Sequence, residues 1–174
     1  MPNGVWIDEE GIIVRPAEPA FSRSARSADG DYPPLPDDMD PYLRDVLIEA
    51  RKIRVEPERY VAALRDWVTR GSDSVYALSP GEVVARSRAR TPEMALAAAN
   101  FELGQHLHRS GDTQAAVPYF REAHRLDPDN WTYKRQAWTF ANPLQAPSKD
   151  YDSDWLSDVR RIGAENYYPP LDMP

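Results

Sequence analysis

The three histidines are the residues best suited to metal binding in this chain of 174 residues. His106 and His108 lie two residues apart on a predicted helix, so they point in different directions and do not form the i, i+4 pair of a helical metal site. His124 lies on the next predicted helix and could approach one of them. We interpret all three as surface or groove histidines and expect no bound metal.

The acidic side chains near the C-terminus raise the question of a calcium site. Their spacing does not match that of an EF-hand loop, and we interpret them as helix caps and solvated charge. They are Asp150, Asp152, Asp154 and Asp158.

No serine lies in a nucleophile-elbow motif, and no glycine-rich loop could bind phosphate. The chain contains no cysteine, which excludes disulfides, thiolate nucleophiles and cysteine metal ligands within it. We therefore expect no catalysis and no cofactor.

The overall composition narrows the class of partner. The net charge of −7 repels phosphate backbones, and no basic stripe offsets it, so we expect no nucleic-acid binding. No apolar run is long enough to cross a bilayer. Asp8, Glu9 and Glu10 stand where a signal peptide needs apolar residues, so we expect a cytoplasmic protein. Its partner would be a protein or a peptide.

The N-terminal residues have the pattern of a β-hairpin. Two runs of β-forming residues, Val5–Ile7 and Ile12–Val14, flank a turn in which Gly11 takes the left-handed position. Pro16 and Pro19 are expected to end the second strand. We therefore assign residues 1–19 to a hairpin and residues 20–39 to a linker rich in Ser, Arg, Asp and Pro.

The rest of the chain predicts capped, amphipathic helices. Their expected starts are Asp40-Pro41, Pro57, Ser79-Pro80, Thr91-Pro92, Asp112, Asp129 or Asn130, and about residue 153. Proline at the first helical position and capping side chains mark these starts. We assign residues 40–141 to one helical domain. Residues 142–174 form a tail rich in proline and aromatic residues, with a short helix at about 153–162 and an extended stretch at 167–170.

Residues 97–130 resemble a tetratricopeptide (TPR) repeat in one register. The matching residues are Leu103, Gly104, Ala116, Phe120, Ala123 and Pro128. Asn100 and Leu107 depart from the family, which usually has Trp and Tyr there. In this family the glycine allows the two helices to approach closely, so we expect Gly104 to meet Ala116. One repeat does not bury both its faces, which implies that residues 41–90 and 131–140 act as degenerate repeats or caps.

The resemblance implies a mainly α fold of TPR-like antiparallel helix pairs, with the hairpin at one end and the extended tail at the other. It also implies a protein-binding scaffold. The family's groove positions correspond to Ala98, Phe101, Gln105 and His108. An exposed Phe101 flanked by polar residues would suit peptide capture. The alternative is that the chain's own tail fills this groove.

A second resemblance concerns the two ends of the chain. Residues 1–14 look like the last hairpin of a thioredoxin-fold redoxin, with Pro2 at the position of its cis-proline. Residues 130–138 and 163–169 resemble the C-terminal extension of bacterial ResA-like redoxins that carry a TPR module. This implies an alternative function, the C-terminal part of a redoxin whose redox-active half is absent here. No catalytic residue of that family is present.

The apolar and aromatic residues outside the repeat allow two interpretations. Five of them could form a binding surface, but we favour a role in pinning the tail onto the core. They are Trp131, Trp138, Trp155, Tyr167 and Tyr168.

A lone two-stranded hairpin is marginal in water and has open edges, so residues 1–16 predict a homodimer formed through the hairpin.

Overall fold

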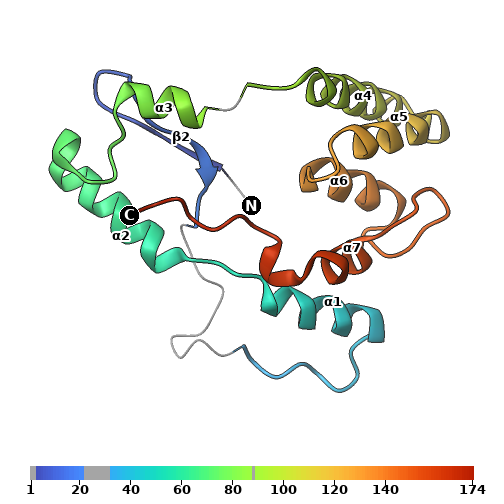
Figure 1. The fold of residues 1–174 in the computed structure, drawn as a ribbon. Coiled ribbons are helices and arrows are strands. Elements are labelled where there is room, and N and C mark those ends of the chain that lie inside the picture. Colours follow the sequence, from blue (N-terminus) through green and yellow to red (C-terminus); the bar gives the residue numbers. More distant parts are fainter. Residues whose placement is uncertain (1–2, 22–31, 88) are drawn as a thin grey trace. The chain divides into compact units, whose positions relative to one another are not determined.

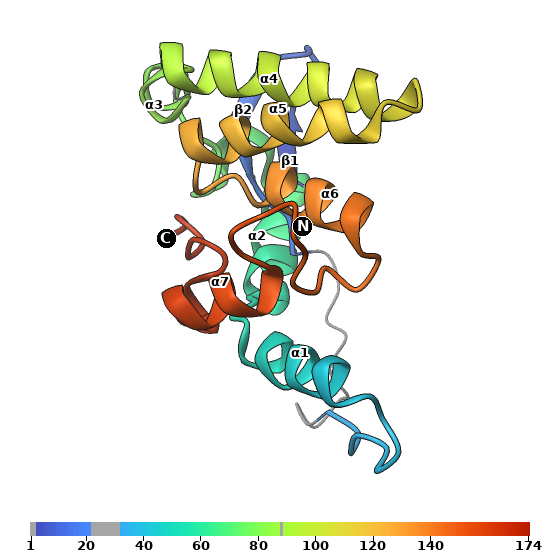
Figure 2. The ribbon, with the colours of Figure 1, turned by 90° about the vertical axis from the view of Figure 1, so that its right-hand side faces the viewer.

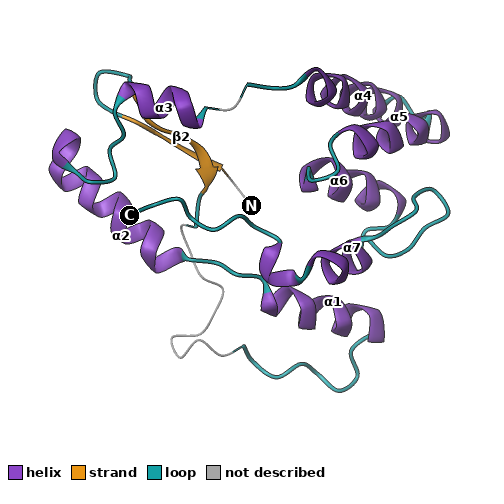
Figure 3. Cartoon of the chain, in the orientation of Figure 1, coloured by secondary structure: helices purple, strands orange, loops and turns teal. Residues whose placement is uncertain are grey.

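The computed structural model describes residues 3–21, 32–87 and 89–174, and it is mainly helical with a small N-terminal hairpin (Figure 1 and Figure 3). The expected fold class is confirmed. The elements are β1 (Asn3–Ile7), β2 (Ile13–Pro19), α1 (Pro41–Lys52), α2 (Pro57–Arg70), α3 (Pro80–Arg86), α4 (Pro92–Arg109), α5 (Thr113–Leu126), α6 (Trp131–Ala141) and α7 (Trp155–Ile162). Two short 3-10 helices cover Gly71–Asp73 and Ala164–Asn166.

The contacts within the chain divide it into two units. Unit 1 consists of residues 1–39, 50–88 and 163–174, and unit 2 of residues 40–49 and 89–162. The region expected as one helical domain, 40–141, is therefore shared between both units. The C-terminal residues return to the unit that contains the hairpin.

The helix starts follow from local capping, as predicted. Ser79 forms a capping box with Glu82, in which each side chain accepts a hydrogen bond from the other residue's backbone N–H. Thr91, Asp112 and Asn130 each accept a hydrogen bond from the backbone N–H three residues later. These caps fix where α3, α4, α5 and α6 begin.

The second strand of the hairpin is longer than the apolar run 12–14 from which it was predicted. The Asp8 side chain closes its turn by accepting from the N–H groups of Glu10 and Ile12, and Gly11 has φ 80°. β2 does not end at Pro16 but continues to Pro19, which lies opposite Asn3. In a two-stranded sheet each strand has a free edge, so a missing proline N–H need not break the ladder.

The core of unit 1 joins the hairpin to α2 and to the C-terminal residues. Its buried members are Trp6, Phe21, Tyr60, Ala63, Leu171 and Met173. Trp6 stacks on Trp67 with ring centroids 5.1 Å apart, and its indole N–H donates to the Tyr60 hydroxyl over 3.2 Å. Phe21 is therefore not part of a linker, because its ring is buried and packs edge-on against Tyr168. Of the other linker residues, 22–31 lie outside the described residues and 32–39 form no helix or strand.

The tail is pinned by aromatic residues, as favoured from the sequence, but it is less extended than predicted. Trp138 and Trp155 are buried in unit 2, and Tyr167 is buried in unit 1. Tyr167 has φ −61° and ψ −35°, because it closes the 3-10 helix Ala164–Asn166 by donating its N–H to the Ala164 carbonyl. The extended course therefore begins after this turn.

The helices α4 and α5 make the most extensive helix–helix contact of unit 2, and they lie side by side in both views (Figure 1 and Figure 2). The expected meeting of Gly104 with Ala116 stays a prediction, and the atoms nearest to Gly104 belong to Phe120. A Cβ added at Gly104 would come within 2.8 Å of the Phe120 ring. Phe120 is fully buried, so its ring cannot move aside. Position 104 therefore requires glycine, because the Phe120 ring occupies the space that a Cβ atom would need.

This contact predicts that Gly104→Ala destabilises the protein. Overpacking a core costs about 1–3 kcal/mol, which exceeds the gain of about 1 kcal/mol from replacing glycine within a helix. We expect a net loss of up to about 2 kcal/mol in chemical denaturation, and a loss of about 1–3 kcal/mol for Ala116→Leu at the same helix pair. Gly81→Ala is the control, because nothing lies within 4 Å of its added Cβ. An unchanged or raised midpoint for Gly104→Ala would contradict the packing described here.

Candidate functional site

The four predicted groove positions lie along α4, and two of them are covered by α6. Phe101 is only 6% exposed, and its ring stacks on Tyr133 with centroids 4.3 Å apart. His108 stacks on Phe140 at 3.8 Å. Ala98 and Gln105 are half-buried. The expectation of an exposed Phe101 is therefore wrong, because the neighbouring helix fills that face.

A different face of α4 is exposed and apolar. Leu96 and Leu103 are 52% and 41% exposed, with Asn100 and Leu107 half-buried on the same side. We call these four residues, spaced at i, i+4, i+7 and i+11, the α4 stripe. The Asn100 side chain donates to the Leu96 carbonyl over 2.8 Å, so its amide is partly satisfied within the helix. This stripe has the character of a face on which another helix packs.

A small polar cavity of about 250 Å³ lies within unit 2, between α5, α6 and the start of α7. Lys134 donates to Asp158 over 2.7 Å, and both side chains are buried. Burial lowers the pKa of the neighbouring His124 to about 4, with a smaller contribution in the same direction from the Lys134 charge. The histidine is therefore neutral at pH 7, and the charges beside it form an ion pair.

Two residues of the acidic cluster, Asp154 and Asp158, have structural roles. Asp154 caps α7 by accepting from the N–H groups of Leu156 and Ser157, as expected. Asp158 was expected to be solvated, and this is wrong because Lys134 from α6 pairs with it. Within the described residues no group of His, Asp and Glu side chains is arranged to hold a metal ion.

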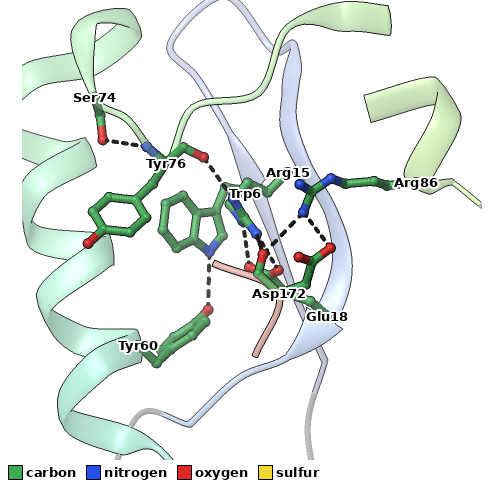
Figure 4. A network of polar contacts seen from close by, with 8 residues as sticks. All are labelled: Trp6, Arg15, Glu18, Tyr60, Ser74, Tyr76, Arg86 and Asp172. Carbon is green, nitrogen blue, oxygen red and sulfur yellow. Dashed lines mark hydrogen bonds and ion pairs between the residues drawn. The ribbon is translucent and has the colours of Figure 1, made fainter. Parts of the chain in front are cut away.

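The hairpin contributes a charged residue to the core of unit 1, shown in Figure 4. Arg15 is 1% exposed and donates two hydrogen bonds to the Glu18 carboxylate, at 2.9 and 3.0 Å. It also donates to the carbonyls of Tyr76 (2.9 Å) and Asp172 (2.7 Å). Its guanidinium lies 5.5 Å from the Trp6 ring centroid. The guanidinium therefore links three segments of unit 1 through hydrogen bonds to one carboxylate and two main-chain carbonyls.

A groove of about 560 Å³ runs beside this network, between β2, the end of α3 and residues 169–172. Pro16, Pro19, Pro169 and Pro170 contribute to its walls. At its rim Arg86 donates to the Asp172 carboxylate over 2.7 Å. The groove is therefore lined by two extended stretches of backbone, and the ion pair of Arg86 with Asp172 lies among its lining residues.

The sequence did not indicate these two buried charge networks. Arg15 and Asp172 are separated by 157 positions, and Lys134 and Asp158 by 24. One signal was available for Arg15, since the strand position opposite Trp6 faces the core. Pro2, the residue compared with a redoxin cis-proline, lies outside the described residues.

Comparison with known proteins adds no identification. No family model matches the chain, and neither the curated proteins nor the solved structures contain a match. Among the described helices none is both long and apolar enough to span a bilayer.

The state of His124 predicts a pH dependence of stability. Its pKa is lower in the folded chain than the ordinary 6.5, so protonation favours the unfolded state, and stability is lost as the pH falls from 6.5 towards 4. Between pH 7 and pH 5 we expect the wild type to lose about 1–2 kcal/mol more than His124→Gln in denaturant unfolding. His106→Gln, at an exposed position, is the control. Parallel pH profiles for wild type and His124→Gln would contradict the burial of a neutral histidine.

Proposed function

We propose that the chain is a protein-interaction module of the TPR type, without catalytic activity of its own. The observation that carries the proposal is the α4–α5 pair, whose close contact at Gly104 and Phe120 falls at positions of the repeat register. Ala116 and Ala123 are buried at the small positions of the same register. The cytoplasmic location expected from the sequence belongs to this proposal.

The binding surface in this proposal is the α4 stripe and not the covered groove positions. Leu96 and Leu103 are the most exposed of its residues, and side chains of this kind bury well against an apolar helix face. Helical repeats bury a continuous core by stacking on neighbouring helices. The partner that fits is therefore an amphipathic helix with apolar residues at i, i+3 or i+4, and i+7.

The alternative is that the chain is the C-terminal part of a thioredoxin-like redoxin. The tight turn of the hairpin, closed by Asp8 and Gly11, is the observation that favours it.

The homodimer through residues 1–16 remains a further prediction. It is supported by the exposure of Val5, Ile7 and Ile13.

A display library of amphipathic helical peptides tests the proposed surface. We expect selection against the full chain to yield binders whose affinity falls at least about tenfold for Leu96→Glu/Leu103→Glu, because each charge would have to be desolvated in the interface. Val68→Glu/Val84→Glu is the matched control, since these valines are equally apolar and still more exposed but lie on α2 and α3. Binders that respond to the control and not to the α4 variant, or a failure to select any, would refute the proposal.

A further inference from the structure

The C-terminal residues lie in unit 1 in the manner of a bound peptide. Leu171 and Met173 are buried in its core, two positions apart, and Asp172 between them has a side chain that is 82% exposed. This alternation is that of an extended segment with one face in an apolar site. The site is built from β1, α2 and Phe21, all far from the tail in sequence.

The backbone of the same segment is held by side chains of unit 1. Arg15 donates to the Asp172 carbonyl over 2.7 Å, and Arg86 donates to the same carbonyl over 3.1 Å. Arg59 donates to the Met173 carbonyl, and the Leu171 N–H donates to the Glu56 carboxylate over 3.1 Å. Recognition of main-chain groups combined with pockets for alternate side chains is the usual basis of extended-peptide binding.

The connection to this segment runs from one unit to the other. Residues 89–162 belong to unit 2, and residues 163–174 belong to unit 1. The change occurs after α7, at Gly163, which has φ 79°. A freely extended chain spans about 3.3 Å per residue, so a segment of this length reaches well beyond its point of attachment.

We propose that residues 163–174 are exchanged between two copies of the chain, so that each copy's segment occupies unit 1 of the other. The exchanged segment makes the same contacts with Arg15, Arg59 and Glu56 in trans as in cis. Exchange of an identical element is a low-cost route to a twofold dimer, since no new interface has to be formed. The groove of about 560 Å³ beside residues 169–172 leaves space along the segment. The inference is independent of the helix-binding surface on α4.

The exposed ion pair between Arg86 and Asp172 gives a direct test in the full-length protein. In Arg86→Glu and in Asp172→Arg each docked segment meets a like charge, in cis and in trans alike. In an exchanged heterodimer of the two variants, Asp172 of one copy meets Arg86 of the other, and the introduced Arg meets the introduced Glu. Only exchange therefore restores both pairs at once.

Native mass spectrometry at low ionic strength, after unfolding and refolding the two variants together, measures the dimers formed. For the wild type we expect a dimer fraction that increases with concentration. In the mixture of the two variants we expect heterodimers about tenfold above the statistical proportion, because the two restored ion pairs together stabilise the heterodimer by about 1.4 kcal/mol. The doubly substituted chain, Arg86→Glu with Asp172→Arg, restores the pair within one copy and should dimerise as the wild type does.

Two results would overturn the exchange. They are a wild type that stays monomeric at every concentration, and heterodimers of the two variants at the statistical proportion. The second result would place the dimer contact elsewhere, for example on the hairpin. Both substitutions lie at exposed or half-exposed positions, and circular dichroism of each single variant verifies folding before mixing.

Discussion

Unit 1 depends on the hydrogen bonds that the buried guanidinium of Arg15 donates. A charged group removed from water is costly unless it is paired and hydrogen-bonded, and Arg15 meets this requirement with the Glu18 carboxylate and two backbone carbonyls. Those partners come from the hairpin, from the loop that follows α2 and from the C-terminal segment. A two-stranded hairpin is marginal alone, so its stability requires these contacts together with the packing of Trp6 on α2.

Unit 2 is organised by a similar constraint. The buried pair of Lys134 and Asp158 joins α6 to α7, and neutral His124 packs beside it. Removing one partner of a buried ion pair leaves an uncompensated charge, which costs about 3–5 kcal/mol. In both units, therefore, buried charges connect separate elements of the fold: the hairpin and the C-terminal segment in unit 1, and α6 and α7 in unit 2.

The part of the fold that could be predicted is the part determined locally. Ser79, Thr91, Asp112 and Asn130 cap helices through bonds to residues three positions away, so the sequence alone located these starts. The hairpin turn at Gly11 was predictable for the same reason. The extension of β2 through Pro16 was not, because it depends on which strand edge remains unpaired.

The candidate site was harder to predict because it depends on what covers each helix face. Phe101 occupies a groove position by its spacing, but only the placement of Tyr133 shows that its ring is buried. In the sequence Asp158 belongs to a run of acidic residues that is typical of a solvated surface. Only the structure shows that Lys134 pairs with it in a buried position. Leu103 was matched to a position of the repeat, and its exposure, like that of Leu96, became evident only from the packing of α4 on α5.

Hydrogen exchange of the full-length chain tests most directly whether Arg15 holds the C-terminal segment. Arg15→Met/Glu18→Gln removes the guanidinium without leaving the Glu18 charge unpaired, and Arg86→Ala removes only the exposed contact to Asp172. A hydrogen bond from a charged donor contributes about 1.5–3 kcal/mol, and the first variant removes the one that Arg15 donates to the Asp172 carbonyl. We therefore predict that the Leu171 amide and its neighbours exchange roughly 10- to 100-fold faster in that variant. Arg86→Ala should stay close to the wild type, and α4 and α5 should keep their protection in both variants. Wild-type protection of residues 163–174 in Arg15→Met/Glu18→Gln would contradict the account.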